Sequence, residues 1–143
     1  MGRLLAVDFG RKYIGLAVTS EDQIAITNLE SLEFHKTNFW ENFFSVIKEY
    51  KPLQLIIGMP YSTGEKSNIL KEIKNFGRHI EKNIPNISIV YWDENFTSIE
   101  AENIFIEKSG KSKTSRKKQK EKKEKTHSMA AHLILKSYIG SSE

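Results

Sequence analysis

Short apolar runs and helical patterns follow one another along the chain, and their order predicts the fold. Positions 3–7 and 13–18 are apolar runs of strand length on either side of a tight turn that contains Gly10, which predicts a β-hairpin. Positions 23–32 alternate imperfectly between apolar and polar residues and predict a third strand, antiparallel to the second. These positions therefore predict a unit of three connected strands.

A helix and a buried strand are predicted next. Aromatic and aliphatic residues recur at helical spacing between Thr37, a candidate N-cap, and Tyr50, and Pro52 ends this helix. The continuous apolar run at 53–57 is typical of a strand buried on both faces. The simplest role for the aromatic residues of this helix is to fill the core.

A second helix and strand continue the pattern. A turn-rich loop at 58–64 precedes a helix over 65–83, and the apolar run at 87–92 predicts another buried strand. Two helix–strand units after three antiparallel strands indicate an α/β fold, a mixed five-stranded sheet with parallel crossovers and flanking helices.

Two more helices are predicted after the fifth strand. Thr97 and Glu100 form a capping box for a helix that ends before Gly110. Apolar residues at helical spacing over 129–138 predict a final amphipathic helix. Residues 111–125, between these helices, are poor in apolar residues, which predicts a mobile loop.

The length and composition limit the class of protein. The 143 residues are enough for one α/β domain but too few for two lobes, so we expect a single domain over 1–143. With 38% hydrophobic and 28% charged residues, the composition is typical of a soluble globular protein. Because there is no cysteine, no recognisable signal peptide and no apolar run near the roughly 20 residues that span a bilayer, we expect a cytoplasmic protein without membrane contact.

Basic residues are concentrated in the loop predicted at 111–125. This segment holds nine of the 22 Lys and Arg residues and two of the 18 Asp and Glu residues, so the rest of the chain carries 13 basic and 16 acidic residues. Such a run is either a solvated stretch or an arm that binds the phosphate backbone of nucleic acid. As an arm, its candidate contacts are Lys113, Arg116, Lys117 and Lys118.

Candidate chemical groups stand at the carboxyl ends of three predicted strands. Asp8 closes the first strand, a loop that begins with Gly58 follows the fourth, and Asp93 and Glu94 close the fifth. Sites in open α/β sheets gather at these ends. Two carboxylates brought together there can bind Mg²⁺ or Mn²⁺ and support phosphodiester hydrolysis.

Each of these residues also has a purely structural interpretation. An Asp at a strand end near a glycine, such as Asp8, is a common turn former. Asp93 and Glu94 point to opposite sides of a continuing strand, so at most one of them reaches the site directly. His127, before the last helix, is either an exposed or structural histidine, or a metal ligand or proton carrier.

Four segments of the sequence are similar to the motifs of one protein family. They are AVDFGRKYIGLAVTS at 6–20, IIGMPYSTGEKS at 56–67, DENFTSIEAE at 93–102 and SMAAHLILKSYI at 128–139. In order and spacing they resemble the YqgF/RuvX family over nearly the whole chain. The resemblance implies a ribonuclease H-like fold, a bacterial cytoplasmic setting, and a nuclease that matures the 5′ end of pre-16S ribosomal RNA, with Holliday junction resolution as an older proposal.

The resemblance also implies roles for individual residues. Asp8 matches the catalytic aspartate of the first strand, and Glu94 matches the glutamate of the family's Asp-Glu-Arg motif, so both are expected to bind metal. Gly58 and Pro60 match residues that shape the loop beside the active site, and Thr97 matches the start of the next helix. We therefore expect Mg²⁺ or Mn²⁺ as the cofactor and precursor rRNA as the partner.

The sequence departs from the family pattern at two positions. Asn95 replaces the arginine of the Asp-Glu-Arg motif, which removes a partner for phosphate or carboxylate. His127 replaces the final aspartate and lowers the negative charge of the site by one, although imidazole can also bind metal. We expect Asp8, Glu94 and His127 to be the catalytic and metal-binding residues, with His127 acting as the third ligand or as a proton carrier.

Two basic residues follow Asp8, and two other classes of protein share part of the sequence pattern. Arg11 and Lys12, in the turn after Asp8, are expected to contact a nearby phosphate. A nucleic-acid-binding protein without catalysis remains an alternative, because the acidic set is altered while the basic segment is intact. Actin-like ATPases and sugar kinases also begin with Asp-x-Gly and a hairpin, but they need a second lobe for which this chain is too short.

Overall fold

A computed structural model gives the fold of the chain. It describes residues 2–60, 67–93 and 116–141, and at 67 and 116–126 it describes the backbone only. The elements, in chain order, are β1 (Leu4–Phe9), β2 (Tyr13–Thr19), β3 (Ile26–Glu33), α1 (Phe39–Tyr50), β4 (Gln54–Met59), α2 (Ser67–Asn83), β5 (Ser88–Asp93) and α4 (Arg116–Ser141). In this described part, none of the helices has the length and apolar character needed to cross a membrane.

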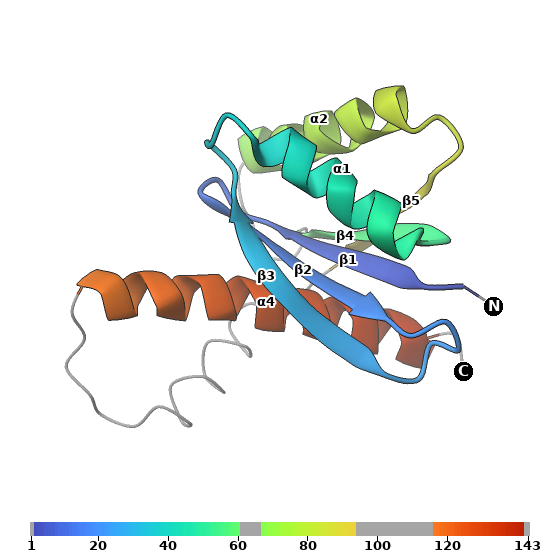
Figure 1. The fold of residues 1–143 in the computed structure, drawn as a ribbon. Coiled ribbons are helices and arrows are strands. Elements are labelled where there is room, and N and C mark those ends of the chain that lie inside the picture. The colour runs from blue at the N-terminus through green and yellow to red at the C-terminus, as the bar shows by residue number, and fades with distance from the viewer. Residues whose placement is uncertain (1, 61–66, 94–115, 142–143) are drawn as a thin grey trace.

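The five strands form one mixed sheet in the order β3-β2-β1-β4-β5 (Figure 1). β1 pairs antiparallel with β2, and β2 pairs antiparallel with β3, while β1 with β4 and β4 with β5 are parallel. This arrangement confirms the predicted five-stranded sheet with parallel crossovers. It also places β1 at the centre, where the strand is buried on both faces.

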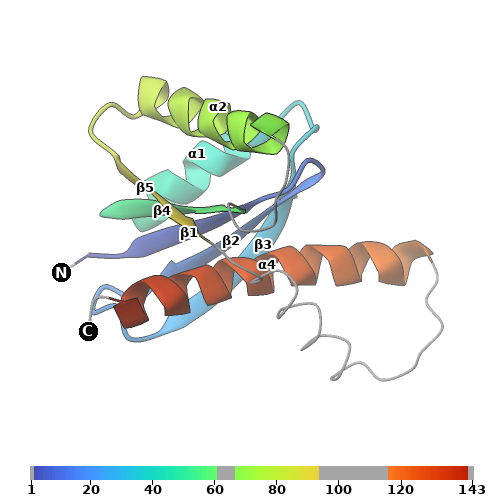
Figure 2. The ribbon, with the colours of Figure 1, turned by 180° about the vertical axis from the view of Figure 1, so that it is seen from behind.

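Helices cover both faces of the sheet. α1 and α2 lie on one face and α4 crosses the other (Figures 1 and 2). Side chains alternate along β1, so Leu5 and Val7 join the core beneath α1 and α2, whereas Leu4 and Ala6 join the core beneath α4. The same alternation turns the next even-numbered residue, Asp8, toward α4.

Aromatic side chains fill the core between the sheet and the helices α1 and α2. Phe39 and Phe43 of α1 are buried, and the Phe43 ring lies 5.5 Å from that of Phe76 on α2, centre to centre. Trp40 stacks at the border of the same cluster, 5.1 Å from Phe76. This packing confirms that the aromatic residues of the first helix belong to the core.

The last helix is longer than the sequence pattern predicts. We expected a loop over 111–125, but α4 begins at Arg116, so residues 116–125 are helical, while 111–115 lie outside the described residues. This segment is rich in good helix formers, namely Lys, Arg, Gln and Glu. It lacks a periodic pattern of apolar residues, so that pattern could not predict the helix. Figure 1 shows the first turns of α4 extending beyond the edge of the sheet.

Candidate active site

The site is built around a buried carboxylate on the central strand. Asp8 lies near the carboxyl end of β1 and is 2% exposed, although every earlier residue of the strand is apolar. A buried ionised group is costly unless a partner compensates for the lost water. Asp8 therefore needs a partner on the face of the sheet toward which it points.

His127 of α4 is that partner. Its Nδ1 lies 2.6 Å from Oδ2 of Asp8, and 119 positions separate the two residues in the sequence. The Nδ1–H donates to the carboxylate, and so short a distance is typical of a hydrogen bond to an ionised acceptor. The His127 side chain is 28% exposed, so one face of this buried pair reaches solvent.

Two glycines of the β1–β2 hairpin make room for this contact. Gly15 lies directly opposite Asp8 in the ladder, and a Cβ on it would collide with the main-chain carbonyl of His127. A Cβ on Gly10 would lie 2.7 Å from Cε1 of His127 and 2.6 Å from the carbonyl oxygen of Tyr13. Both glycines are thus required for α4 to approach the end of β1 this closely.

A row of polar contacts fixes α4 against the edge strand β3 next to His127. Ser128 donates from its hydroxyl to the carbonyl of Leu29 at 2.8 Å, and that hydroxyl lies 2.9 Å from Oγ of Ser31. One turn further along, Nδ1 of His132 lies 2.8 Å from Oδ1 of Asn28. These contacts fix the position of α4 along the strands of the sheet, and so they determine where His127 meets Asp8.

The neighbouring strand ends surround the Asp8–His127 pair. Val7 pairs with Ile57, so Gly58 comes level with Asp8 on the adjacent strand β4. On β5, Asp93 pairs with Met59 and is exposed at the same end of the sheet. Gly58 therefore lies inside β4, level with Asp8, whereas the sequence predicts that the loop already begins at this residue.

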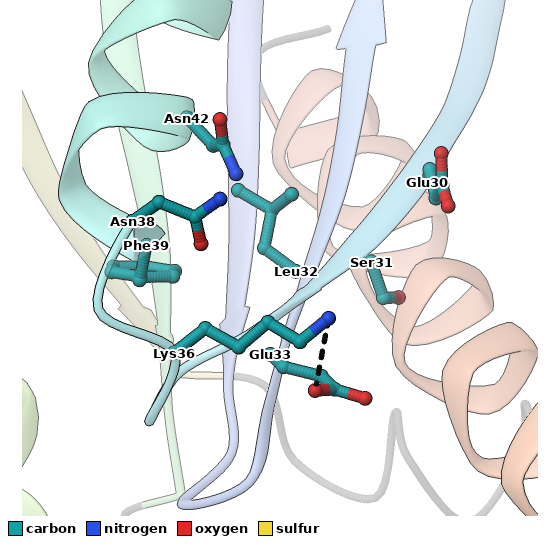
Figure 3. Close-up of a pocket in the computed structure, with 8 residues that line it drawn as sticks. All are labelled: Glu30, Ser31, Leu32, Glu33, Lys36, Asn38, Phe39 and Asn42. Atoms are coloured by element: carbon teal, nitrogen blue, oxygen red, sulfur yellow. Dashed lines mark ion pairs between the residues drawn. The ribbon is translucent and has the colours of Figure 1, made fainter.

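A polar pocket lies beside the site, at the outer edge of β3 and the start of α1 (Figure 3). It has a volume of about 460 Å³ and is lined by Glu30, Ser31, Leu32, Glu33, Lys36, Asn38, Phe39 and Asn42. The Lys36 ammonium pairs with the Glu33 carboxylate across it at 3.5 Å. None of the predicted site residues lines this pocket, so it is separate from the Asp8–His127 pair.

A model of one protein family matches residues 2–141, and it is the model of RuvX, described as a Holliday junction resolvase. The chain belongs to the RuvX family. Curated relatives include a "putative pre-16S rRNA nuclease" of Bacteroides fragilis, which is 33% identical over 97% of this chain and 96% of its own length. A protein of the same name from Dictyoglomus turgidum is also 33% identical, over 97% of this chain and 94% of its own.

Two resolvases are among the solved structures with the same fold. The fowlpox virus resolvase, determined with Holliday junction DNA, superposes with a TM-score of 0.57 at 17% identity and covers 98% of both chains. RuvC of T. thermophilus, determined with a Holliday junction substrate, superposes with a TM-score of 0.54 at 11% identity and covers 96% of both chains. The RuvX-family chain therefore has the ribonuclease H-like fold that the sequence motifs imply.

The predicted site residues fall into three groups in this RuvX-family structure. Asp8 and His127 are brought into direct contact, and Gly58 and Pro60 stand at the adjoining strand end. Glu94 and Thr97 lie outside the described residues, and so does Lys113. The backbone of Arg116, Lys117 and Lys118 forms the first turn of α4.

The two basic residues of the hairpin turn lie next to the site but have different partners. Arg11 donates from Nε to the carboxylate of Glu72 on α2 at 2.9 Å, in an exposed ion pair. The Lys12 ammonium lies 5.5 Å from the centre of the Tyr13 ring. Lys12 is thus oriented by an aromatic face, whereas Arg11 must leave Glu72 before it can bind a phosphate.

The donor atoms at the site fit a divalent ion only in part. Across residues 2–60, 68–93 and 127–141 no group of three or more His, Asp or Glu side chains is gathered in a way that could hold a metal ion. Asp8 and His127 supply one carboxylate and one imidazole, a mixed oxygen and nitrogen set that suits Mg²⁺ less well than carboxylates alone. A third ligand is needed, and Glu94 is the residue predicted for that position.

Sequence reasoning missed the residues that hold His127 in place. Gly15 and Ser128 do no chemistry of their own, and nothing in their local sequence indicates that they position His127. The spacing of Gly10 and Gly15 was visible in the hairpin, but only the position of α4 explains why both lack a side chain.

Proposed function

We propose that this protein is a metal-dependent nuclease that hydrolyses phosphodiester bonds in RNA during maturation of the 5′ end of pre-16S rRNA. The observation that carries the proposal is the pairing of Asp8 with His127 at the carboxyl end of the central strand. Asp8 is buried, and His127 is open to solvent on one side. Apolar residues could pack at this strand end equally well, so a pair of titratable groups there supports a catalytic role. The names of the curated relatives support RNA as the substrate.

Asp8, His127 and Glu94 are the proposed ligands of Mg²⁺ or Mn²⁺. When bound, the ion supplies Lewis-acid activation of water and neutralises charge on the phosphate. Asp8 orients the imidazole through Nδ1 of His127. With Nδ1 engaged in this way, Nε2 of His127 is the one atom left, and it serves either as the third ligand of the ion or as the atom that accepts and returns a proton at the scissile phosphate.

Basic residues hold the substrate in this proposal. Lys12 contacts a phosphate beside the scissile bond, and Arg11 joins it when the nucleic acid competes with Glu72. Lys113, Arg116, Lys117 and Lys118 bind the backbone without reading the bases. We also propose a cytoplasmic location for the protein. We propose that residues 1–143 form a single catalytic domain.

Holliday junction resolution is the second candidate function. It is favoured by the description of the family model and by two structures of the same fold that were determined with Holliday junctions. A protein that binds nucleic acid without cleaving it is the third candidate, favoured by Asn95 and His127 at positions where the family has arginine and aspartate. All three share the Asp8 end of the sheet as the binding site.

Cleavage of labelled 5′ precursor rRNA fragments and of a four-way DNA junction, in Mg²⁺, Mn²⁺ or EDTA, separates these candidates. Asp8→Asn is compared with Asp22→Asn, an exposed carboxylate in the β2–β3 turn. The proposal requires cleavage of the rRNA that is abolished by EDTA and by Asp8→Asn but not by Asp22→Asn. Cleavage of the junction alone favours a resolvase, and binding without cleavage in either metal refutes a nuclease.

A further inference from the structure

Four basic side chains form one exposed face of α2, and the function proposed above does not use them. Lys71, Lys74, Arg78 and Lys82 are all exposed, and they are spaced three, four and four residues apart. At 3.6 residues per turn they fall within about 80° of one another around the helix axis. Along the axis they extend over about 16 Å. This set is called the α2 basic face below.

The acidic residues of α2 do not neutralise this face. Glu72 projects from the flank of the helix and pairs with Arg11 of the hairpin turn. Glu81 borders the face beside Arg78. Between residues 67 and 83, as far as the structure describes side chains, none of the four basic groups forms an ion pair with an acid. The cations of the α2 basic face are therefore available to an external anion.

Contacts within the protein hold two of the four groups in place. The Lys74 ammonium lies 4.3 Å from the centre of the Tyr91 ring on β5, a cation–π contact. Arg78 donates from Nη1 to Oδ1 of Asn75 at 3.3 Å. These contacts lower the conformational entropy that the side chains lose on binding a ligand.

The position of this face relative to Asp8 suggests its ligand. α2 begins directly beyond the end of β4 that borders the site, and the pair between Arg11 and Glu72 ties its first turns to the hairpin turn after Asp8. Lys71 therefore lies at the end of the sheet that carries Asp8, and Lys82 is at the far end of the helix. α2 and α4 cover opposite faces of the sheet (Figure 2), so α2 offers a path away from the site that is separate from the basic start of α4.

Charge makes an RNA strand the appropriate ligand. Outside 111–125 the chain carries 13 basic and 16 acidic residues, so four cations on one helix face are a positive patch on a body of net negative charge. A row of cations of this length can follow successive phosphates of a strand without any base contact. A second copy of the chain is a poor ligand, because a twofold contact here would press the four cations against their own copies.

We propose that the α2 basic face binds the RNA backbone that flanks the scissile phosphate, through successive phosphates along the length of α2. The inference rests on the proposed function for the identity of the nucleic acid. The α2 basic face lengthens the stretch of RNA that contacts the protein. Long precursors therefore bind more tightly than short fragments that reach only the site at Asp8.

The test compares two sets of four substitutions with equal change in charge. Lys71, Lys74, Arg78 and Lys82 are changed to Gln, which keeps helix propensity. In the control protein the exposed Lys36, Lys48, Lys51 and Lys136 are changed to Gln. Fluorescence anisotropy in EDTA measures the affinity for long and short rRNA fragments, and for a four-way DNA junction, as a function of salt.

We expect the α2 variant to bind the long RNA at least about tenfold more weakly than the control variant, with a salt slope reduced by about three. On the short RNA the two variants should agree. Equal affinities for the long RNA in the two variants would overturn the inference. So would a selective loss on the DNA junction alone, or a change of oligomeric state in the α2 variant only, since these would identify a different ligand.

This outcome is independent of whether the protein cleaves RNA. If no metal supports cleavage but the α2 variant loses affinity for long RNA, the proposed function fails and the α2 basic face stands. If the natural protein and the α2 variant cleave long RNA with the same KM and the same salt slope, the nuclease stands and the α2 basic face fails.

Discussion

Gly15 lies directly opposite Asp8 in the β1–β2 ladder, and the main chain of His127 occupies the space where a Gly15 side chain would be. Strand β2 therefore has two functions in the site: it pairs with the strand that carries the carboxylate, and it admits the helix that carries the imidazole. Ala6 and Ala17 are small residues on the same face of the sheet, and they also let α4 pack closely against it. The distance between α4 and the sheet is thus a property of the site as well as of the core.

Gly15→Ala should displace His127 from Asp8. The added methyl group meets main-chain atoms, which cannot rotate away, so α4 must shift, at a cost of about 1–3 kcal/mol in the free energy of unfolding. Chemical denaturation measures the loss, and nuclease activity should fall with it. Gly140→Ala is the matched control, because a Cβ there has no neighbour within 4 Å. Equal effects of the two changes would contradict this account of Gly15.

His127→Asp should make folding depend on a divalent ion. The new carboxylate faces Asp8 without the hydrogen bond of the imidazole, so in EDTA the free energy of unfolding should fall by about 1.5–3 kcal/mol. Mn²⁺ or Mg²⁺ at a hundredfold excess over its Kd should restore about 2.7 kcal/mol. Thermal unfolding with and without metal measures both effects.

His35→Asp makes the same chemical change at an exposed position and is the control for this experiment. It should show neither the loss in EDTA nor the gain in metal. A variant at His127 whose stability is the same in EDTA and in Mn²⁺ would speak against metal binding beside Asp8.

Ser128→Ala and Ser31→Ala should be coupled. The Ser128 hydroxyl bonds to the Leu29 carbonyl and to Ser31, and each hydrogen bond contributes about 0.5–1.5 kcal/mol. Because the two serines share one contact, the double variant should lose less stability than the sum of the single variants. A double-mutant cycle by urea unfolding measures the difference. Losses that add to within about 0.3 kcal/mol would show that the two hydroxyls act separately.

The stability of the protein should decrease as His132 becomes protonated. Burial lowers the pKa of His132 below its ordinary value of 6.5, and the charge of Lys136 lowers it further. The unfolded state therefore takes up the proton first, so the stabilising contribution is complete above the unfolded pKa and is lost as pH falls through the folded pKa. Unfolding free energies measured at a series of pH values, together with NMR titration of the imidazole, test this order.

Lys136→Gln removes the second cause of this shift and leaves the burial of His132 in place. The pKa of His132 should then move part of the way back toward its ordinary value, so the loss of stability on acidification should be smaller and should be complete at a higher pH. A His132 pKa equal to or above its unfolded value in the natural protein would contradict the prediction.

The sheet was predictable because its evidence is local. Alternating and continuous apolar runs gave all five strands, and the position of Asp8 at the end of the first strand indicated where chemistry belongs. The contact between Asp8 and His127 depends on packing between segments 119 residues apart, and only the family resemblance indicated it. The start of α4 was missed because lysine-rich helices have no apolar period.

The two halves of the Asp8–His127 pair also differ in when they are made. During translation β1 leaves the ribosome before the part of α4 that carries His127, which lies 119 positions after Asp8. Until then the Asp8 side of the sheet has no cover, and the carboxylate faces water instead of imidazole. A nascent chain therefore carries an incomplete centre until residue 127 has emerged and α4 has packed against the sheet.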